Sequence, residues 1–250
     1  SDLTVGMTED DLKKLPKHYL DVFNVEIIPW TDEAIMHNWK LQNEWKAYHM
    51  TPYDETIKLD ADMLFTVDVD YYWEIAKARN FPIAVCDTIH TFRDVVGDDS
   101  YYRQGFKDNQ FYNAYSALTY FAKSDEALTF FNQVEDIYRH WDKYANNFMR
   151  INPNEVAYTD EVYGMAIRLL GWQDKVRPPK SFSFVHMKSK CQGLLDYSVR
   201  DVDWTDYLDG QYNEEGMWIN NYYQTKPVHY VMKSWCTDEL IKTLEKQAGV

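Results

Sequence analysis

Two aspartates separated by one residue, Asp60 and Asp62, follow a short β-prone run in this chain. Residues 56–59 have the composition of a short buried strand, which would deliver both carboxylates at its carboxyl end. Open α/β sheets bind their ligands at that end. Two carboxylates placed there can face one hard cation, and Mg²⁺ or Mn²⁺ held in this way keeps open positions for substrate phosphates. A solvated acidic turn is the alternative, which the preceding apolar strand disfavours.

A second strand-like run, residues 183–185, delivers His186 and is followed by Lys188 and Lys190. A histidine placed after a strand could be a third metal ligand, and the two lysines could neutralise a diphosphate. A structural histidine is the alternative. We therefore predict His186 as the third metal ligand beside the two aspartates, with Lys188 and Lys190 as donor-binding residues.

The residues around the aspartates carry a family resemblance. Residues 52–64 read Pro-Tyr-Asp-Glu-Thr-Ile-Lys-Leu-Asp-Ala-Asp-Met-Leu. This segment resembles the "Tyr-Asp…Tyr-Leu-Asp-Ala-Asp" segment of nucleotide-sugar glycosyltransferases with the GT-A fold, notably the glycogenin and galactosyltransferase-like family 8. It is more similar still to their relatives in large bacteriophages. The resemblance covers about residues 38–193, and it implies that Asp60 and Asp62 bind a divalent ion that bridges the donor diphosphate.

The resemblance also implies donor contacts further along the chain. Residues 113–121 are similar to the family strand "Asn-Ser-Gly-Val-Met-Val-Phe", whose first residues face the donor sugar, so Asn113, Tyr115 and Ser116 become donor-binding candidates. Ala117 stands where the family has glycine. An ordinary buried strand would have much the same sequence.

A predicted helix over residues 159–170 opens with Asp160 and Glu161. Acidic residues in a first turn are explained by helix capping and the helix dipole alone. The family, however, places an Asp-containing helix start beside the sugar, facing the acceptor. The resemblance therefore implies Asp160 as the first catalytic candidate and Glu161 as the second.

A predicted helix over residues 31–50 precedes the first strand of the site and carries Lys40 and Lys46. A lysine at its inner edge could reach a donor phosphate, so both residues are donor-binding candidates. A solvated lysine is the alternative for each, because lysine usually lies at the surface.

Composition limits the class of protein. A chain of 250 residues with 45% hydrophobic residues can build one sizeable core, and its three scattered cysteines suit neither a disulfide framework nor a four-ligand zinc site. No apolar run approaches the roughly 20 residues of a membrane span, and no basic-then-apolar leader is present. We expect no membrane association and a cytoplasmic location, in the host cytoplasm if the protein is viral.

The predicted fold class is α/β, with a GT-A-like (Rossmann-like) mixed sheet flanked by helices. We expect a donor-binding and catalytic domain over residues 1–200 and an aromatic-rich appendage over residues 201–250, packed on the same domain. No strand followed by a helix is predicted at the start of the chain, and residues 87–110 are expected to be a long loop. The predicted strands cover residues 25–28, 56–59, 83–85, 113–121 and 183–185, and further helices are predicted over residues 69–79 and 124–141 and from residue 237.

The leading functional prediction is a metal-dependent glycosyltransferase that moves a sugar from a nucleotide-sugar donor, first of all a UDP-sugar, to a hydroxyl acceptor. The phage-like resemblance implies a hydroxymethylated pyrimidine in DNA as acceptor, whereas the net charge of -14 argues against tight duplex binding. A phosphatase of the haloacid-dehalogenase type with Asp60 as nucleophile is one alternative. It is disfavoured because Leu64 stands where that family has Thr or Val. A non-catalytic sugar-nucleotide-binding protein of the same fold is the other alternative.

Overall fold

The computed structural model describes residues 2–29, 40–97, 100–149, 156–187, 208–230 and 233–248. It shows a mixed α/β protein, so the predicted α/β class is confirmed. The amino-terminal half comprises β1 Thr4–Met7, α1 Glu9–Lys14, a 3₁₀ helix Lys17–Asp21, β2 Asn24–Ile27, η2 Lys40–Lys46, α3 Ala47–Met50, β3 Glu55–Leu59, β4 Met63–Leu64, α4 Val69–Lys77, β5 Ile83–Val85, β6 Ile89–His90, α5 Ser100–Asp108 and β7 Leu118–Ala122. The remainder comprises α6 Asp125–Arg139, α7 Trp141–Phe148, α8 Thr159–Leu170, β8 Phe184–His186, β9 Gly210–Asn213, β10 Gly216–Ile219, β11 Tyr222–Tyr223, β12 Val228–His229, a 3₁₀ turn η4 Lys233–Trp235 and α9 Asp238–Ala248.

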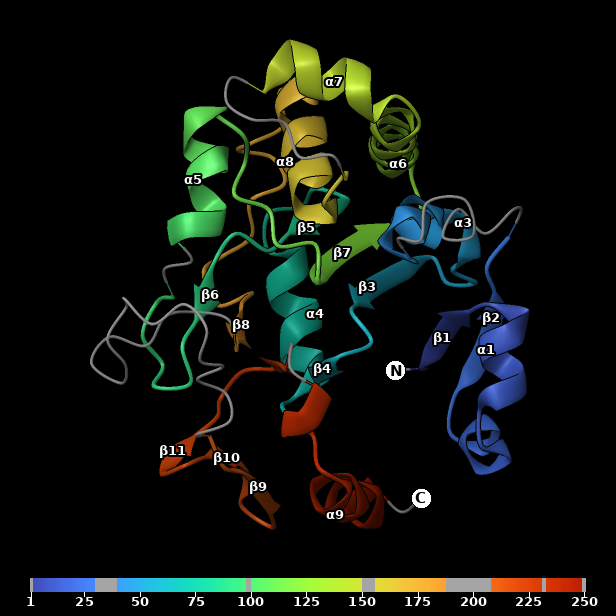
Figure 1. The fold of residues 1–250 in the computed structure, drawn as a ribbon, viewed down its shortest axis with the longest axis vertical. Coiled ribbons are helices and arrows are strands. Elements are labelled where there is room, and N and C mark those ends of the chain that lie inside the picture. Colours follow the sequence, from blue (N-terminus) through green and yellow to red (C-terminus); the bar gives the residue numbers. More distant parts are fainter. Residues whose placement is uncertain are drawn as a thin grey trace.

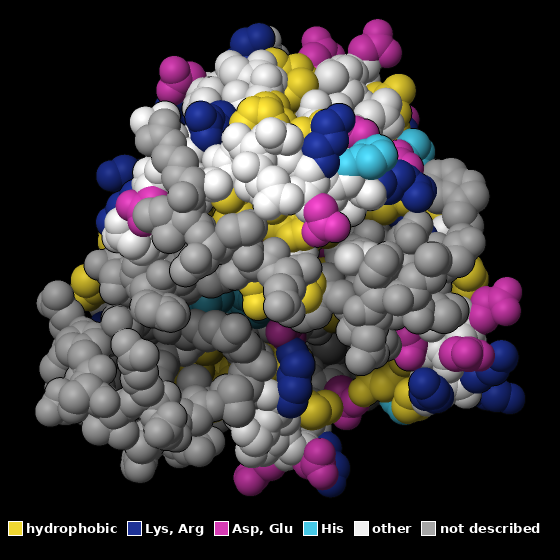
Figure 2. Space-filling model, turned by 45° about the horizontal axis from the view of Figure 1, so that its top comes forward, with side chains coloured by type: hydrophobic (Ala, Val, Ile, Leu, Met, Phe, Trp, Pro, Cys, Tyr) yellow, Lys and Arg dark blue, Asp and Glu magenta, His cyan; other side chains and the backbone are white. Residues whose placement is uncertain are grey.

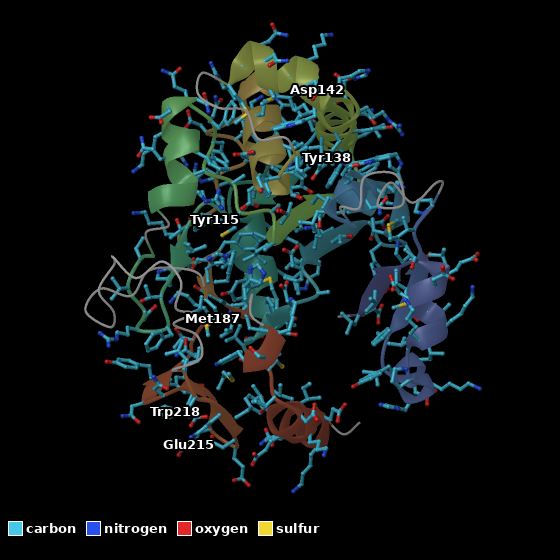
Figure 3. All side chains as sticks on the ribbon, in the orientation of Figure 1. Tyr115, Tyr138, Asp142, Met187, Glu215 and Trp218 are labelled. Carbon is cyan, nitrogen blue, oxygen red and sulfur yellow. The ribbon has the colours of Figure 1, made fainter. Side chains whose placement is uncertain are left out.

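The described strands form four small sheets. One has the order β3-β7-β5, in which the middle strand runs antiparallel to both neighbours. A second has the order β4-β12-β8-β6 and is mixed, because β12 is antiparallel to β4 and parallel to β8. Helices α5, α6, α7 and α8 cover one end of the molecule, and β9, β10, β11 and α9 lie at the other (Figure 1). Tyr115 and Met187 lie between these two ends (Figure 3).

Helices α6 and α8 build the main core against the β3-β7-β5 sheet. Ser124 caps α6, its Oγ accepting from the backbone N–H of Ala127 at 3.1 Å, and one face of the helix is buried. Gly171, with φ of 66°, ends α8 in the left-handed conformation that glycine adopts readily. At Gly164 a Cβ would lie 2.5 Å from the carbonyl oxygen of Tyr112, so this glycine lets α8 approach the segment that leads into β7.

Several sequence expectations need correction. The start of the chain does contain a strand followed by a helix, β1 and α1, and β1 pairs in parallel with β2. Residues 87–110 are not one long loop, because they include β6 and α5. The strand expected over residues 113–121 begins only at Leu118, since the residues before it make turns and non-ladder hydrogen bonds. The expected helix over residues 31–50 is a 3₁₀ helix followed by α3 where it is described, and residues 30–39 lie outside the described residues.

The carboxyl-terminal part is built into the body of the molecule. Strand β12 lies between β4 and β8, and therefore completes a sheet that begins before residue 65. A shared core joins Phe92, Val185 and Met187 to Ile219 and Trp235. The segment expected to form an aromatic appendage thus packs on the rest of the protein and supplies one of its internal strands.

Candidate metal centre

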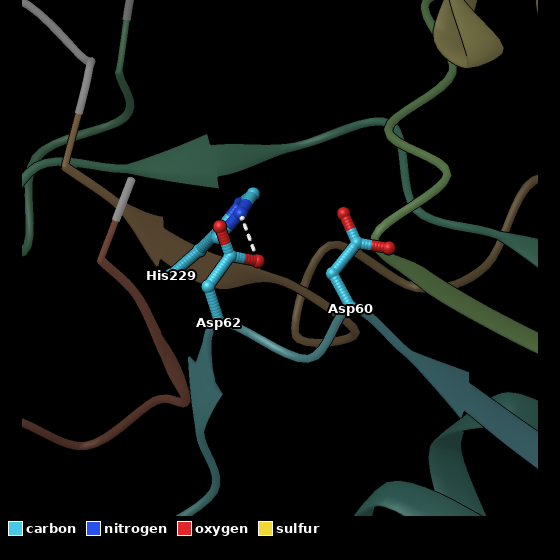
Figure 4. Close-up of side chains that lie close together, drawn as sticks. All are labelled: Asp60, Asp62 and His229. Carbon is cyan, nitrogen blue, oxygen red and sulfur yellow. Dashed lines mark hydrogen bonds and ion pairs between the residues drawn. The ribbon is translucent and has the colours of Figure 1, made fainter. Parts of the chain in front are cut away.

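Asp60 and Asp62 lie on the short connection between β3 and β4. The carbonyl oxygen of Asp60 accepts from the N–H of Met63 at 3.2 Å, which closes a turn directly after β3. The N–H of Asp60 donates to the carbonyl oxygen of Ala117 at 3.2 Å, and the carbonyl oxygen of Asp62 accepts from Tyr230 at 3.1 Å. The backbone of both aspartates is therefore held at two points, and their carboxylates lie at the same edge (Figure 4).

The third side chain of the centre is His229, which β12 contributes from the carboxyl-terminal part of the chain. In the antiparallel register His229 is opposite Met63, one residue from Asp62. Its Nε2 lies 3.0 Å from Oδ1 of Asp62 (Figure 4). One potential ligand atom from each of Asp60, Asp62 and His229 can be chosen so that all three lie within 4.8 Å of one another. Strand pairing therefore brings together residues separated by about 170 positions.

Lys233 adds a positive charge at this edge. Its Nζ lies 2.6 Å from Oδ2 of Asp62, and its side chain is 69% exposed. Burial opposes the charge on Asp62, but the hydrogen bonds and charges of His229 and Lys233 outweigh this effect and hold the pKa of Asp62 well below its usual range. Asp62 is therefore ionised throughout the neutral range, as a metal-binding carboxylate must be.

The donor set fits a divalent cation of the kind predicted. Carboxylate oxygens are the ligands that Mg²⁺ and Mn²⁺ prefer, and an imidazole nitrogen suits transition metals. Two carboxylates with one imidazole therefore favour Mn²⁺ over Mg²⁺. Three protein ligands leave further coordination positions for water or for phosphate oxygens.

Asp60 also contacts a buried ion pair. Nζ of Lys58 lies 3.2 Å from Oδ1 of Asp60 and 2.5 Å from Oε2 of Glu44. Burial raises the pKa of Glu44 to about 7, against the opposing effect of Lys58. Burial by itself would lower the pKa of Lys58, but Glu44 and Asp60 together raise it above its ordinary value. Lys58 is thus a permanent cation directly beside the centre.

Asp160, in the first turn of α8, accepts hydrogen bonds from the segment that precedes β7. Its Oδ1 accepts from both the backbone N–H and the Oγ of Ser116 at 2.8 Å, and its Oδ2 lies 2.6 Å from Nη2 of Arg103. Three hydrogen bonds to other protein groups occupy most of the lone pairs of this carboxylate. Asp160 is therefore built to position residues 113–117, and Glu161 beside it is 4% exposed.

No match was found for this chain. The search covered models of protein families, curated proteins and solved structures. Among the described residues, no helix is both long and apolar enough to span a membrane.

The structure groups His229 with the two aspartates, and not the predicted third ligand His186. His186 lies on β8 in register with His229 on the neighbouring strand, and the two rings are 5.2 Å apart between centroids. The grouped ligand atoms are those of His229 and the two aspartates. In the described part of the chain, His229 is therefore the better candidate, because β12 lies between β4 and β8 and separates His186 from the aspartates.

The sequence carries a pattern that points to His229 and Lys233. Residues 228–229 form a short β-prone run ending in histidine, and Lys233 follows four residues later. This is the same pattern of strand, histidine and lysine that led to the prediction of His186. The aromatic residues of positions 201–235 favour an appendage instead of a site, so sequence reasoning misses His229 and Lys233.

The predicted donor residues fall into four groups. Ser116 is buried, and both its N–H and its Oγ donate to Asp160. Asn113 and Tyr115 lie on a cavity of about 230 Å³ next to the segment held by Asp160. Lys46 is fully buried in η2, so it is not the solvated lysine of the alternative interpretation. Lys188 and Lys190 lie outside the described residues, as does the side chain of Lys40. The cavity is lined by Gly97, Arg103, Phe106, Lys107, Phe111, Asn113 and Tyr115.

Proposed function

We propose that this protein is a metal-dependent glycosyltransferase that uses a nucleotide-sugar donor. The observation that carries the proposal is the convergence of Asp60, Asp62 and His229, with Lys233 at the edge of the same group. This arrangement supplies carboxylate and imidazole ligands for a cation, together with an exposed positive charge on Lys233. A nucleotide-sugar donor needs both, because its nucleoside diphosphate leaving group develops negative charge as the bond to the sugar breaks.

A divalent ion, when bound by Asp60, Asp62 and His229, would act as a Lewis acid toward the phosphate oxygens. Lys233 has an exposed side chain, so its ammonium group can neutralise a diphosphate that approaches from solvent. Asn113 and Tyr115 line the cavity of about 230 Å³, and we propose that they contact the donor sugar. Asp160 contributes by fixing these two residues through Ser116.

The finer fold prediction, a GT-A-like architecture, belongs to the same proposal. It is supported by the position of the two aspartates at the carboxyl end of β3 and by helices that cover one end of the sheets (Figure 1).

Hydroxymethylated DNA remains the proposed acceptor. Over the described part of one face, Lys and Arg side chains are interspersed with Asp and Glu (Figure 2). With a net charge of -14, long-range attraction to a duplex is not expected. A DNA acceptor would therefore be held by local contacts, and its binding would weaken steeply with salt as counterions are released.

The proposal is tested by incubating the protein with Mn²⁺ and a panel of nucleotide-sugars, UDP-sugars first, and measuring release of the nucleoside diphosphate. We expect Mn²⁺-dependent release that Asp62→Asn abolishes. Asp54→Asn is the matched control, because Asp54 is an exposed aspartate of the same segment and should leave release unchanged.

Other outcomes of this assay identify the alternatives. Hydrolysis of a simple phosphate monoester, without release from any nucleotide-sugar, would indicate the phosphatase with Asp60 as nucleophile. Binding of a nucleotide-sugar with no release would indicate a non-catalytic binding protein. Absence of Mn²⁺ binding would overturn the metal centre itself. Transfer to hydroxymethylated DNA, with unmodified duplex as control, then tests the acceptor.

A further inference from the structure

Lys58 occupies an unusual place for a lysine. It is the fourth of the five residues of β3, and its side chain is only 11% exposed. A lysine this deep is rarely found without partners, because removing an ammonium group from water is costly. The partners of Lys58 therefore indicate why the position carries a lysine instead of an apolar residue.

Three acceptors surround the ammonium group, each from a different part of the chain. Nζ of Lys58 lies 2.5 Å from Oε2 of Glu44, 3.0 Å from the carbonyl oxygen of Ser116 and 3.2 Å from Oδ1 of Asp60. Lys58 therefore donates hydrogen bonds to Ser116 and Asp60, and its contact with Glu44 is an ion pair. Glu44, with a side chain only 12% exposed, supplies the buried counter-ion.

The contact with Ser116 extends this arrangement to the donor segment. The carbonyl oxygen of Ser116 accepts from Lys58, while its N–H and Oγ both donate to Asp160. Ser116 is thus held from both sides. A single ammonium group joins the metal carboxylate Asp60 to the segment that carries Asn113 and Tyr115.

We propose that Lys58 is a positioning residue that fixes Asp60 and residues 113–117 relative to one another, with Glu44 as its counter-ion. This role rests on the proposed metal centre. Oδ1 of Asp60 is held by Lys58, which limits rotation of the carboxylate and presents it in one orientation. Outer partners that orient a ligand in this way are typically worth 10–100-fold in metal affinity.

Charge and position predict opposite effects of removing Lys58. If the ammonium acted only through its charge, its loss would strengthen Mn²⁺ binding, because one positive charge would disappear from beside the site. If it acts by holding Asp60, its loss weakens Mn²⁺ binding despite the favourable change in charge. The direction of the change in affinity therefore distinguishes the two roles.

The test measures Mn²⁺ affinity by electron paramagnetic resonance of the free ion, in the 250-residue chain. We expect Lys58→Met to raise the Kd by about 10–100-fold. Lys77→Met is the matched control, because Lys77 also forms a 2.5 Å ion pair with a β3 residue, Glu55, but at an exposed position away from Asp60. Its Kd should equal that of the parent.

A double variant, Glu44→Met with Lys58→Met, covers the case in which the single variant does not fold. It leaves no unpaired buried carboxylate, and replacing a buried ion pair with apolar residues is often tolerated. At about pH 8.5, where Glu44 with its pKa of about 7 is ionised in the parent, the net charge of the double variant equals that of the parent. A charge effect alone then predicts an unchanged Kd, whereas we again expect the loss. Unchanged or tighter binding in either variant would overturn the role of Lys58. Absence of Mn²⁺ binding in the parent would instead overturn the metal centre on which that role rests.

Discussion

Exchange of His229 for alanine is the most informative single change, because it separates the histidine that the structure presents from the one that the sequence pattern predicted. His229 offers one of three grouped ligand atoms, and its Nε2 lies 3.0 Å from Asp62. Loss of a direct ligand should exceed the 10–100-fold cost of an outer partner. We therefore expect His229→Ala to weaken Mn²⁺ binding by at least about 100-fold, or about 2.8 kcal/mol.

His186→Ala is the matched control for this prediction. His186 is a histidine at the same register on the adjacent strand, and its ring packs 5.2 Å from that of His229. Its removal should only loosen the neighbouring ring, with a loss of about 10-fold or less, at the low end for an outer partner. Isothermal titration with Mn²⁺ at one neutral pH, on variants with the circular dichroism of the parent, measures both effects. A larger loss in His186→Ala than in His229→Ala would refute the assignment of His229.

Three further changes test the surroundings of the centre. Lys233→Met should weaken UDP binding by about 10-fold. Mn²⁺ affinity should stay equal or rise, because the ammonium group of Lys233 no longer competes with the ion for Asp62. Titration with each ligand separately measures both effects, and a fall in Mn²⁺ affinity would contradict the prediction. Asp160→Asn should lower the free energy of unfolding by about 1.5–3 kcal/mol in urea, since it removes the charged partner of Arg103; an unchanged midpoint would deny Asp160 its positioning role. The pKa of Asp62 is lowered in the folded protein, so its contribution to stability is complete above its unfolded-state pKa of about 3.9 and is lost as the pH falls below that value. The difference in unfolding free energy between the parent and Asp62→Asn should therefore shrink in acid. A difference that does not change with pH would contradict the lowered pKa.

Local patterns were sufficient for the elements that depend on neighbours in sequence. The helix α8 occupies residues 159–170 as predicted, because its start with two acidic residues and its end at Gly171 are local signals. The strand before Asp60 was also found within one residue, since a short β-prone run between polar segments indicates a strand by itself. These elements place Asp60, Asp62 and Asp160 at the ends of secondary structure.

Local patterns failed where a short strand or turn is stabilised by distant partners. Strand β1 is only four residues long, and it exists because β2 pairs with it in parallel. Residues 113–117 look like a continuation of β7, but hydrogen bonds from Ser116 to Asp160 and from Tyr115 to Cys86 take them out of the strand pairing. Propensity cannot reveal such partners, because they lie tens of residues away.

The composition of the centre shows the same division. The sequence by itself determined that Asp60 and Asp62 share the end of a strand, because two residues separated by a single residue remain close in any fold. The choice of His229 over His186 was decided only by the tertiary structure, in which β12 is inserted between β4 and β8. A two-residue strand gains its stability from the sheet that it joins, so its position follows from long-range pairing and packing and not from its own residues.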